Sequence, residues 1–149
     1  MIIRIGLGSC GIAAGAKQIK EAVEQEIAAT GLNVEIKQTG CIGTCHNEPL
    51  LDVITDDGKV FTFEHVTAEM VKTIFEEYLK AGQLDEKCLT AMTNMTKNYL
   101  DGQIRIALRN CGRIDPEQIE DYISCGGYEA LKKVTAMTPL EVIEEIKIS

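Results

Sequence analysis

The sequence predicts an α/β fold for residues 1–80, followed by a small, mostly helical C-terminal appendage. Short apolar runs and one-sided helical patterns follow one another in the order β-α-β-β-β-α, and the capping patterns of helices recur after residue 100. The chain has 149 residues, of which 45% are hydrophobic and 26% are charged. This is an ordinary globular composition, with enough length for one moderate core and an appendage.

A parallel pair of strands is predicted at the start of the chain. Residues 1–7 form an apolar run, and residues 34–39 begin with alternating apolar and polar side chains. Between them, apolar residues at helical spacing predict a helix over residues 12–30, which Gly31 ends. The apolar face of this helix consists of Ile12, Ala16, Ile19, Val23 and Ile27. A right-handed helical crossover between parallel strands brings their carboxyl ends to the same edge of the sheet.

The second half of the sheet is predicted to be a hairpin. Residues 50–55 and 60–64 are apolar runs typical of strands, and Asp56-Asp57-Gly58 between them is a turn signal. Thr67 then caps a predicted helix over residues 67–80. The apolar face of this helix consists of Met70, Val71, Ile74, Phe75, Tyr78 and Leu79. We expect both helices to pack on one small mixed sheet.

The pattern predicts three parts along the chain. Residues 1–82 form the α/β domain, and residues 83–100 form a linker, because threonine and asparagine interrupt its apolar positions. Residues 101–149 form the helical appendage. No internal repeat is visible.

Three short helices are predicted in the appendage. Asp115 and Pro116 form a helix start, with the aspartate as the cap and the proline in the first turn. Gly126-Gly127 ends that helix, and a second short helix follows. Thr138 and Pro139 repeat the capping pattern at the start of a terminal helix.

The charge of the chain limits the partners that it can bind, and its apolar stretches indicate where it is located. The formal net charge is −8, the isoelectric point is near 4.8, and no basic block is present, so a phosphate backbone would be repelled. We therefore exclude nucleic acid and expect a basic or redox protein partner. The sequence opens on a strand-like run and contains no apolar stretch of membrane-spanning length. This predicts a cytoplasmic protein without membrane insertion.

Six cysteines indicate metal or redox chemistry, because their spacing is irregular and the chain is large enough to fold without disulfides. Cys41 and Cys45 lie four residues apart in a glycine-bearing loop, where both thiols can bend toward one point. Cys10 ends the first apolar run, so the predicted topology brings it to the same strand-end edge. Thiolates that converge in this way bind soft metals or iron–sulfur clusters, or oxidise to a disulfide. The other cysteines are interpreted as small buried or half-buried residues: Cys88, Cys111 and Cys125.

The first loop also matches the dinucleotide-binding pattern G-x-G-x-x-G. The match runs from Gly6 to Gly11, between a predicted strand and a predicted helix. The pattern requires an acidic residue at the end of the second strand, but Glu35 lies in the middle of that strand. A hairpin also follows where further βα units belong. We therefore expect no dinucleotide here and interpret the glycines as permitting a tight turn around whatever Cys10 touches.

Several short motifs lie at the ends of the predicted elements. Gly8-Ser9-Cys10 opens the first helix, and Thr39-Gly40-Cys41-x-x-x-Cys45 follows the second strand. Glu48-Pro49 precedes an apolar strand, and Asp57-Gly58 turns the hairpin. Together with the element order, these motifs resemble the thioredoxin-like [2Fe-2S] ferredoxins. The resemblance implies that fold, a [2Fe-2S] cluster held by the three matching cysteines, Cys10, Cys41 and Cys45, and a role in single-electron transfer.

The appendage carries a second set of motifs, which are Ile106-Ala107-Leu108-Arg109-Asn110-Cys111-Gly112, Ile114-Asp115-Pro116 and Gly126-Gly127-Tyr128-Glu129-Ala130-Leu131. They resemble the lead-in to the flavin domain of complex I's NADH-binding subunit. In NAD-linked hydrogenases and formate dehydrogenases, relatives of that subunit carry a thioredoxin-like ferredoxin domain before this lead-in. The combination implies a redox subunit of an NADH:acceptor oxidoreductase, with other redox subunits as partners, rather than a catalyst by itself. A homo-oligomer is also left open.

The chain departs from this family in two respects. The ferredoxins use four cysteines, and the fourth would fall upstream of Cys10, where the chain has Ile5-Gly6-Leu7-Gly8. The fourth ligand would then be Ser9, His46, a thiol from elsewhere or a solvent species, although His46 and His65 fit the role of solvated loop residues better. The chain also ends before the glycine-rich loop that binds flavin and NADH in the family. We therefore expect no FMN or NADH binding by this chain alone.

Three alternatives to an electron-transfer module remain open. A ferredoxin domain that has lost its cluster would act as a structural or docking module of a larger oxidoreductase. Cys41 and Cys45 would form a redox dithiol, although their spacing is wider than C-x-x-C. Structural zinc would use Cys10, Cys41, Cys45 and His46, which are suitable ligand types without the usual paired spacing.

Overall fold

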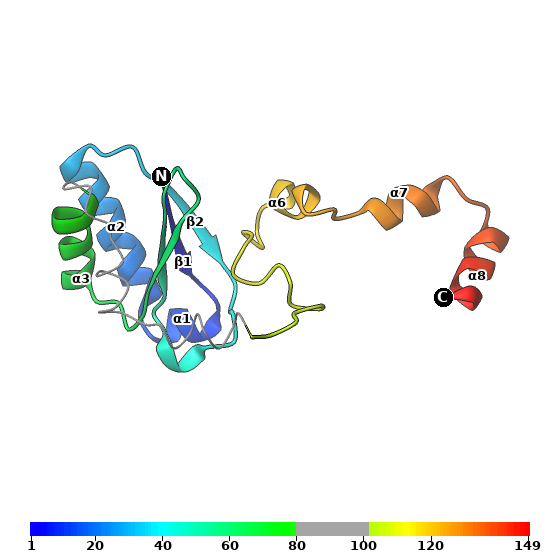
Figure 1. Ribbon diagram of the computed structural model, residues 1–149, viewed down its shortest axis with the longest axis horizontal. Helices are drawn as coiled ribbons and strands as arrows, with labels where there is room; N and C mark the ends of the chain where they lie inside the picture. The colour runs from blue at the N-terminus through cyan, green and yellow to red at the C-terminus, as the bar shows by residue number, and fades with distance from the viewer. Residues whose placement is uncertain (80–101) are drawn as a thin grey trace. The chain divides into compact units, whose positions relative to one another are not determined.

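The computed structural model describes residues 1–79 and 102–149 (Figure 1). These residues divide into two compact units, Met1–Asp115 and Pro116–Ser149, which we describe separately. Residues 102–115 therefore belong to the first unit. Most of the predicted linker, residues 83–100, and Cys88 within it lie outside the described residues, so the predicted division at this linker stays a prediction.

The first unit is built on a four-stranded mixed sheet with the strand order β2-β1-β3-β4. The strands are β1 (Ile2–Gly6), β2 (Glu35–Thr39), β3 (Leu51–Ile54) and β4 (Val60–Phe63). β1 pairs with β2 in parallel, and the other two pairs are antiparallel. Both the predicted parallel pair and the predicted hairpin are confirmed. The carboxyl ends of β1 and β2 therefore lie side by side, with Gly6 opposite Thr39.

The crossover between β1 and β2 consists of two helices, α1 (Ser9–Ala13) and α2 (Ala16–Thr30). The prediction of one helix over residues 12–30 is wrong, because Gly15 takes a left-handed conformation with φ 105° and interrupts the helix. Ile12 lies before this break and is 42% exposed, so it does not share the buried face that the sequence pattern predicted for it. Gly31 ends α2 as predicted, with φ 66°.

The second predicted helix is confirmed as α3 (Ala68–Thr73), which continues in π-helical turns as η2 (Ile74–Leu79). The Thr67 side chain accepts a hydrogen bond from the Met70 N–H and caps α3 as predicted. Helices α2 and α3 lie side by side in Figure 1. Their buried side chains form one core with those of the sheet: Ile3, Ile5, Val23, Leu51, Val53, Phe61, Phe63, Val71, Ile74 and Phe75.

A polar network crosses three neighbouring strands of the sheet. The guanidinium group of Arg4 on β1 donates to Oδ2 of Asp52 on β3 twice, from Nε at 3.0 Å and from Nη2 at 2.7 Å. The Thr62 hydroxyl on β4 donates to the other carboxylate oxygen at 2.7 Å. The Arg4 and Asp52 side chains are only 13% and 18% exposed, so this pair is better shielded from water than an ordinary surface salt bridge.

The second unit consists of the short helices α6 (Ile119–Ser124) and α7 (Glu129–Thr135) and the longer α8 (Pro139–Ile148). The mostly helical appendage and the capping box of Thr138 and Glu141 at the start of α8 are confirmed. The predicted helix start at Asp115 is wrong, because α6 begins at Ile119. Asp115 is instead buried in the first unit, where it accepts a hydrogen bond from Gln38. None of the described helices is long and apolar enough to cross a membrane.

We expect the substitution Asp52→Ala to destabilise the protein by about 2 kcal/mol, because it leaves the partly buried Arg4 guanidinium without its charged partner. Urea unfolding at neutral pH measures this change. Glu35→Ala is the matched control: it removes an exposed carboxylate on β2 and should change the free energy of unfolding by less than about 0.5 kcal/mol. Equal effects of the two substitutions would contradict the stabilising role of the network.

Candidate metal centre

Two thiols meet in the loop that follows β2. The Sγ atoms of Cys41 and Cys45 lie 3.4 Å apart, as the sequence predicted from their spacing. The Gly43 N–H donates to the Cys41 sulfur at 3.3 Å, and Gly43 has a left-handed φ of 99°. A glycine adopts this conformation without steric cost, so the loop can turn back and bring the two sulfur atoms together.

The cysteine loop comprises residues 40–48, and its C-terminal end is fixed to the rest of the first unit. Cys45 begins the 3₁₀ turn η1 (Cys45–Asn47). The Asn47 carbonyl accepts a hydrogen bond from the His65 N–H at 2.9 Å, and the Pro49 carbonyl accepts one from the Val66 N–H at 3.1 Å. Both donors follow β4, so the hairpin anchors the loop after its second cysteine.

The loop between β1 and α1 lies directly against the cysteine loop. The Leu7 N–H donates to the Thr39 carbonyl at 2.9 Å, which extends the parallel pairing past the strand ends. A Cβ atom at Gly8 would lie 3.0 Å from the backbone nitrogen of Cys41 and 3.2 Å from its Cβ. Only glycine permits this approach without displacing a backbone, so Gly8 brings the first loop against the first cysteine of the second.

The other two glycines of the G-x-G-x-x-G match surround a buried carboxylate. Glu48 is 7% exposed, and its Oε2 accepts a hydrogen bond from the Leu50 N–H at 2.9 Å. A Cβ atom at Gly6 or Gly11 would lie 3.1 or 3.0 Å from this oxygen, and the one at Gly11 would lie only 2.3 Å from the Gly6 carbonyl oxygen. The glycines thus make room for the protein's own Glu48 and Cys41.

Cys10 lies on α1, two residues after Gly8, and it is exposed. Among the described residues, no three histidine, cysteine, aspartate or glutamate side chains lie close enough together to hold a metal ion. The structure therefore joins Cys41 with Cys45 but does not add Cys10 to the same group. Cys10 as a third ligand stays a prediction.

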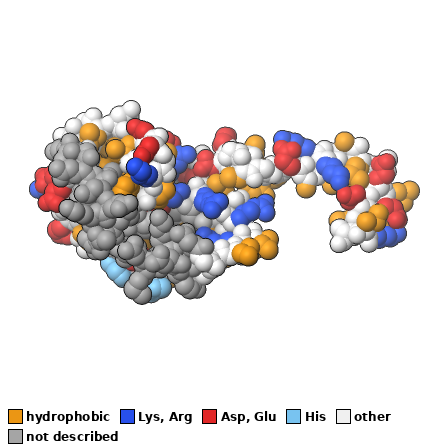
Figure 2. All heavy atoms as spheres, viewed as in Figure 1, with side chains coloured by type: hydrophobic (Ala, Val, Ile, Leu, Met, Phe, Trp, Pro, Cys, Tyr) orange, Lys and Arg blue, Asp and Glu red, His pale blue; other side chains and the backbone are white. Residues whose placement is uncertain are grey.

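The remaining residues singled out from the sequence are distributed as follows. Ser9, the first residue of α1, is exposed, and so are His46 and His65, in agreement with solvated loop positions. Histidine side chains are visible at the surface in Figure 2. Cys111 is half-buried as expected, whereas Cys125 is exposed, which corrects the expectation that it is buried or half-buried.

Two opposing effects act on the first thiol of the loop. The hydrogen bond from the Gly43 N–H lowers the pKa of Cys41, but burial, the hydrogen bond and charge of Cys45 and the charge of Glu48 together outweigh it, so the pKa is raised. Bringing two thiolates this close therefore has an electrostatic cost. A bound cation or cationic cluster removes that cost, because metal binding replaces both protons.

The donor set fits an iron–sulfur cluster in its chemistry, and one buried group near it lacks a partner. Thiolates are the ligands that such clusters require, and two of them already converge. Thr44, which precedes Cys45, is 2% exposed, and its hydroxyl has no hydrogen-bond partner among the described residues. This unpartnered hydroxyl is adjacent in sequence to Cys45, one of the two converging thiols.

Sequence reasoning missed Glu48 and Thr44 as parts of this site. In the sequence Glu48 belongs only to the Glu48-Pro49 motif, and nothing local indicates that a carboxylate before a proline is buried. The three glycines from Gly6 to Gly11 were the available signal, since small residues on one loop indicate that another segment approaches closely.

Comparisons with known proteins place the chain near hydrogenase subunits. No family model matches the chain. It is 62% identical over 47 residues to the NADP-reducing hydrogenase subunit HndC of Solidesulfovibrio fructosivorans. This match covers 32% of this chain and 10% of that protein. It is 32% identical over 83 residues to subunit HndB from the same organism. This second match covers 55% of this chain and 66% of that protein. The chain thus spans less than two thirds of either relative.

Among solved structures, the chain is similar to a thioredoxin-like [2Fe-2S] ferredoxin from Aquifex aeolicus. One crystal structure of that ferredoxin has 20% sequence identity and a TM-score of 0.47, and the match covers 58% of this chain and 91% of that one. A second structure has 19% identity and a TM-score of 0.46, with 58% and 86% covered.

We expect the stability of the protein to depend on pH through Glu48. Burial raises the pKa of Glu48, although the Leu50 N–H acts to lower it. Between the ordinary value of 4.5 and the raised value, the folded state binds this proton more strongly than the unfolded state does. The free energy of unfolding should therefore fall as pH rises through that window.

Urea unfolding of wild type and Glu48→Gln between pH 4 and pH 8 measures this effect. The neutral amide has no proton to lose, so the variant should gain stability relative to wild type as pH rises. The matched control Glu35→Gln changes an exposed carboxylate and should show no such gain. A stability difference for Glu48→Gln that does not change with pH would rule out the burial effect.

Proposed function

We propose that the chain is an electron-transfer module of a nicotinamide-nucleotide-linked hydrogenase, and that Cys10, Cys41 and Cys45 supply thiolates to a [2Fe-2S] cluster. The observation that carries the proposal is the pair of sulfur atoms 3.4 Å apart at the end of the parallel strand pair. When bound, such a cluster accepts and passes single electrons. Similarity to the hydrogenase subunits HndC and HndB supports the assignment to a hydrogenase.

The residues of the chain would hold and tune the cluster in separate ways. Cys41 and Cys45 would bind it from one loop, and Cys10 would bind it from the start of α1, just after Gly8, which lies against Cys41. The Gly43 N–H already donates to the Cys41 sulfur, and a hydrogen bond to a ligating sulfur stabilises the reduced, more negative state. Ser9 and His46 stay the weak candidates for the fourth ligand, and both are exposed, as Cys10 and Cys45 are.

Other redox subunits are the partners that fit this role. HndB and HndC are named as subunits of one NADP-reducing hydrogenase, and a protein of net charge −8 is suited to a basic surface on its partner. A one-electron carrier needs such a donor and acceptor, because the chain's proposed cluster has no substrate of its own. We therefore place the chain inside a larger oxidoreductase rather than treating it as a catalyst by itself.

A cluster-free docking module is the second candidate function. The observation that favours it is that, in the described part of the chain, only two thiols converge, whereas a [2Fe-2S] cluster usually takes four ligands. Wild-type protein that stays colourless after anaerobic reconstitution with iron and sulfide would favour this candidate.

We expect no binding of FMN or NADH by the chain alone. The glycines of the G-x-G-x-x-G match lie against Glu48 and Cys41, so the space that a pyrophosphate needs at this turn is filled by the protein. Isothermal titration calorimetry with each nucleotide should show no saturable heat at micromolar concentrations. Saturable binding that is lost in Gly8→Ala would instead make the first loop a nucleotide site.

Single cysteine-to-serine substitutions test the ligand assignment. Serine at position 10, 41 or 45 removes a soft ligand and should bleach or shift the visible absorption of the reconstituted protein. Wild type should bind about two iron and two sulfide per chain, as a [2Fe-2S] cluster requires. Cys125→Ser is the matched control, because this exposed thiol lies in the second unit, and its spectrum should equal that of wild type.

The same comparison extends to the remaining two cysteines, Cys88 and Cys111, whose replacement by serine should change stability at most. Loss of the cluster on changing either of them, or its survival in all three variants at positions 10, 41 and 45, would place the site elsewhere.

A further inference from the structure

A segment distant in the sequence is hydrogen-bonded to the strands that carry the metal centre. The Arg4 guanidinium donates from Nη1 to the Arg113 carbonyl at 3.3 Å. The Thr39 hydroxyl, at the end of β2, donates to the Ile114 carbonyl at 3.1 Å, and the Gln38 amide donates to the Asp115 carboxylate at 3.4 Å. Residues 113–115 are thus fixed to β1 and to the last residues of β2.

The residue before this anchored stretch packs on the cysteine loop. Gly112 has a left-handed φ of 80°, and a Cβ atom there would lie 2.3 Å from Cγ2 of Ile42. The next atom in reach is the Ile42 Cβ at 3.6 Å, an ordinary van der Waals distance. The backbone of Gly112 therefore lies directly against the Cγ2 methyl group of Ile42. A residue with a side chain could not occupy position 112 unless Ile42 or the backbone moved.

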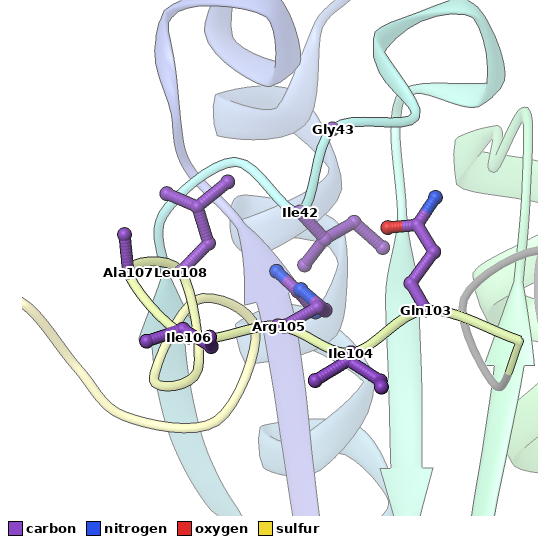
Figure 3. A pocket seen from close by; sticks show the side chains of 8 residues that line it. All are labelled: Ile42, Gly43, Gln103, Ile104, Arg105, Ile106, Ala107 and Leu108. Carbon is purple, nitrogen blue, oxygen red and sulfur yellow. The ribbon is translucent and has the colours of Figure 1, made fainter.

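Ile42 is also the side chain that the cysteine loop contributes to a neighbouring cavity. This cavity, of about 280 Å³, is lined by Ile42, Gly43 and residues 103–108 (Figure 3). In Figure 3, Ile42 lies beside Arg105 and faces the 103–108 segment. The half-buried side chain of Ile42 is thus a contact of the loop with both Gly112 and the cavity lined by residues 103–108.

The first half of the loop, before the buried Thr44, is open at its two glycines. Neither Gly40 nor Gly43 has a neighbour within 4 Å of the position that a Cβ atom would take. Gly8 lies against Cys41, and Gly112 lies against Ile42, the next residue. A displacement of the Ile42 backbone would be passed to Cys41, the residue before it, whereas Cys45 is anchored through η1 and Asn47.

We propose that the contact between Gly112 and Ile42 positions Cys41 relative to Cys45, so that residues 102–115 act as a positioning element of the metal centre. This inference rests on the proposed function for its biological meaning, since the positioned thiols are the proposed cluster ligands. The contact itself concerns only the separation of two thiols, which can be measured without a cluster. Gly112 and Ile42 are positioning residues and do not touch the bound group.

The test is a double-mutant cycle on this contact. Gly112→Ala inserts a methyl group 2.3 Å from Ile42 Cγ2, which we expect to displace Ile42 and with it the loop, whereas Ile42→Ala leaves a gap. The double variant places the two Cβ atoms at the ordinary distance of 3.6 Å and should restore the contact. Gly126→Ala is the matched control, because Gly126 has nearly the same backbone angle, φ 84°, and no neighbour within 4 Å.

The probe is phenylarsine oxide, a trivalent arsenical that bridges two close thiols, titrated into cluster-free protein kept reduced by a phosphine. Each single variant should bind it about tenfold more weakly than wild type, because misfit packing shifts one thiol. The double variant should recover to within about threefold of wild type, and Gly126→Ala should match wild type. The signal assigned to the pair is the part lost in Cys41→Ser.

A second readout is the circular dichroism of the reconstituted protein in the visible region, which should change in both single variants and return in the double variant. If wild-type protein forms no cluster, the proposed electron-transfer function is contradicted. The arsenical titration would still test whether the Gly112–Ile42 contact positions Cys41 relative to Cys45. Equal affinities for Gly112→Ala and Gly126→Ala, or losses that add in the double variant, would overturn it. Should Gly112→Ala fail to fold, the arsenical affinities of Ile42→Ala and of the double variant are compared instead. The proposal predicts that the double variant binds more tightly, and equal affinities would overturn it.

Discussion

The close approach of two loops at the carboxyl ends of β1 and β2 is the constraint on which the candidate site depends. Gly8 lies against the backbone of Cys41, and a single added carbon would meet that backbone at 3.0 Å. This approach is possible because the parallel pairing continues past the strands through the Leu7–Thr39 hydrogen bond. Without it, the first loop and Cys10 would have no fixed relation to the thiol pair.

The sheet, the glycines and the buried carboxylate form one arrangement. The hydrophobic core fixes β1 beside β2, and the glycines at positions 6 and 11 leave room for Glu48 beneath the loops. Glu48 in turn accepts the Leu50 N–H where the chain enters β3. Gly112 contacts Ile42 of the cysteine loop, and the Ile114 carbonyl accepts a hydrogen bond from Thr39 at the end of β2. The loop that carries the thiol pair thus contacts segments that are far apart in the sequence.

Local patterns predicted much of this fold, and tertiary contacts decided the rest. The parallel pair, the hairpin and the caps at Thr67 and Thr138 follow from periodicity and capping chemistry, so they were predictable. The break at Gly15 was not, because one glycine within a helical pattern is usually tolerated. Asp115 matched a helix cap, but its burial against Gln38 prevailed. The roles of Glu48 and Ile42 depend on segments that no local pattern brings together.

Iron K-edge X-ray absorption spectroscopy on the anaerobically reconstituted protein tests most directly whether the thiols of the two loops hold an iron–sulfur cluster. A [2Fe-2S] centre on these residues predicts iron surrounded mainly by sulfur, together with an iron–iron scattering path. Both features should be lost when Cys41 and Cys45 are replaced together by serine. Iron bound by nitrogen and oxygen alone, or the same spectrum from the double serine variant, would contradict the cluster assignment.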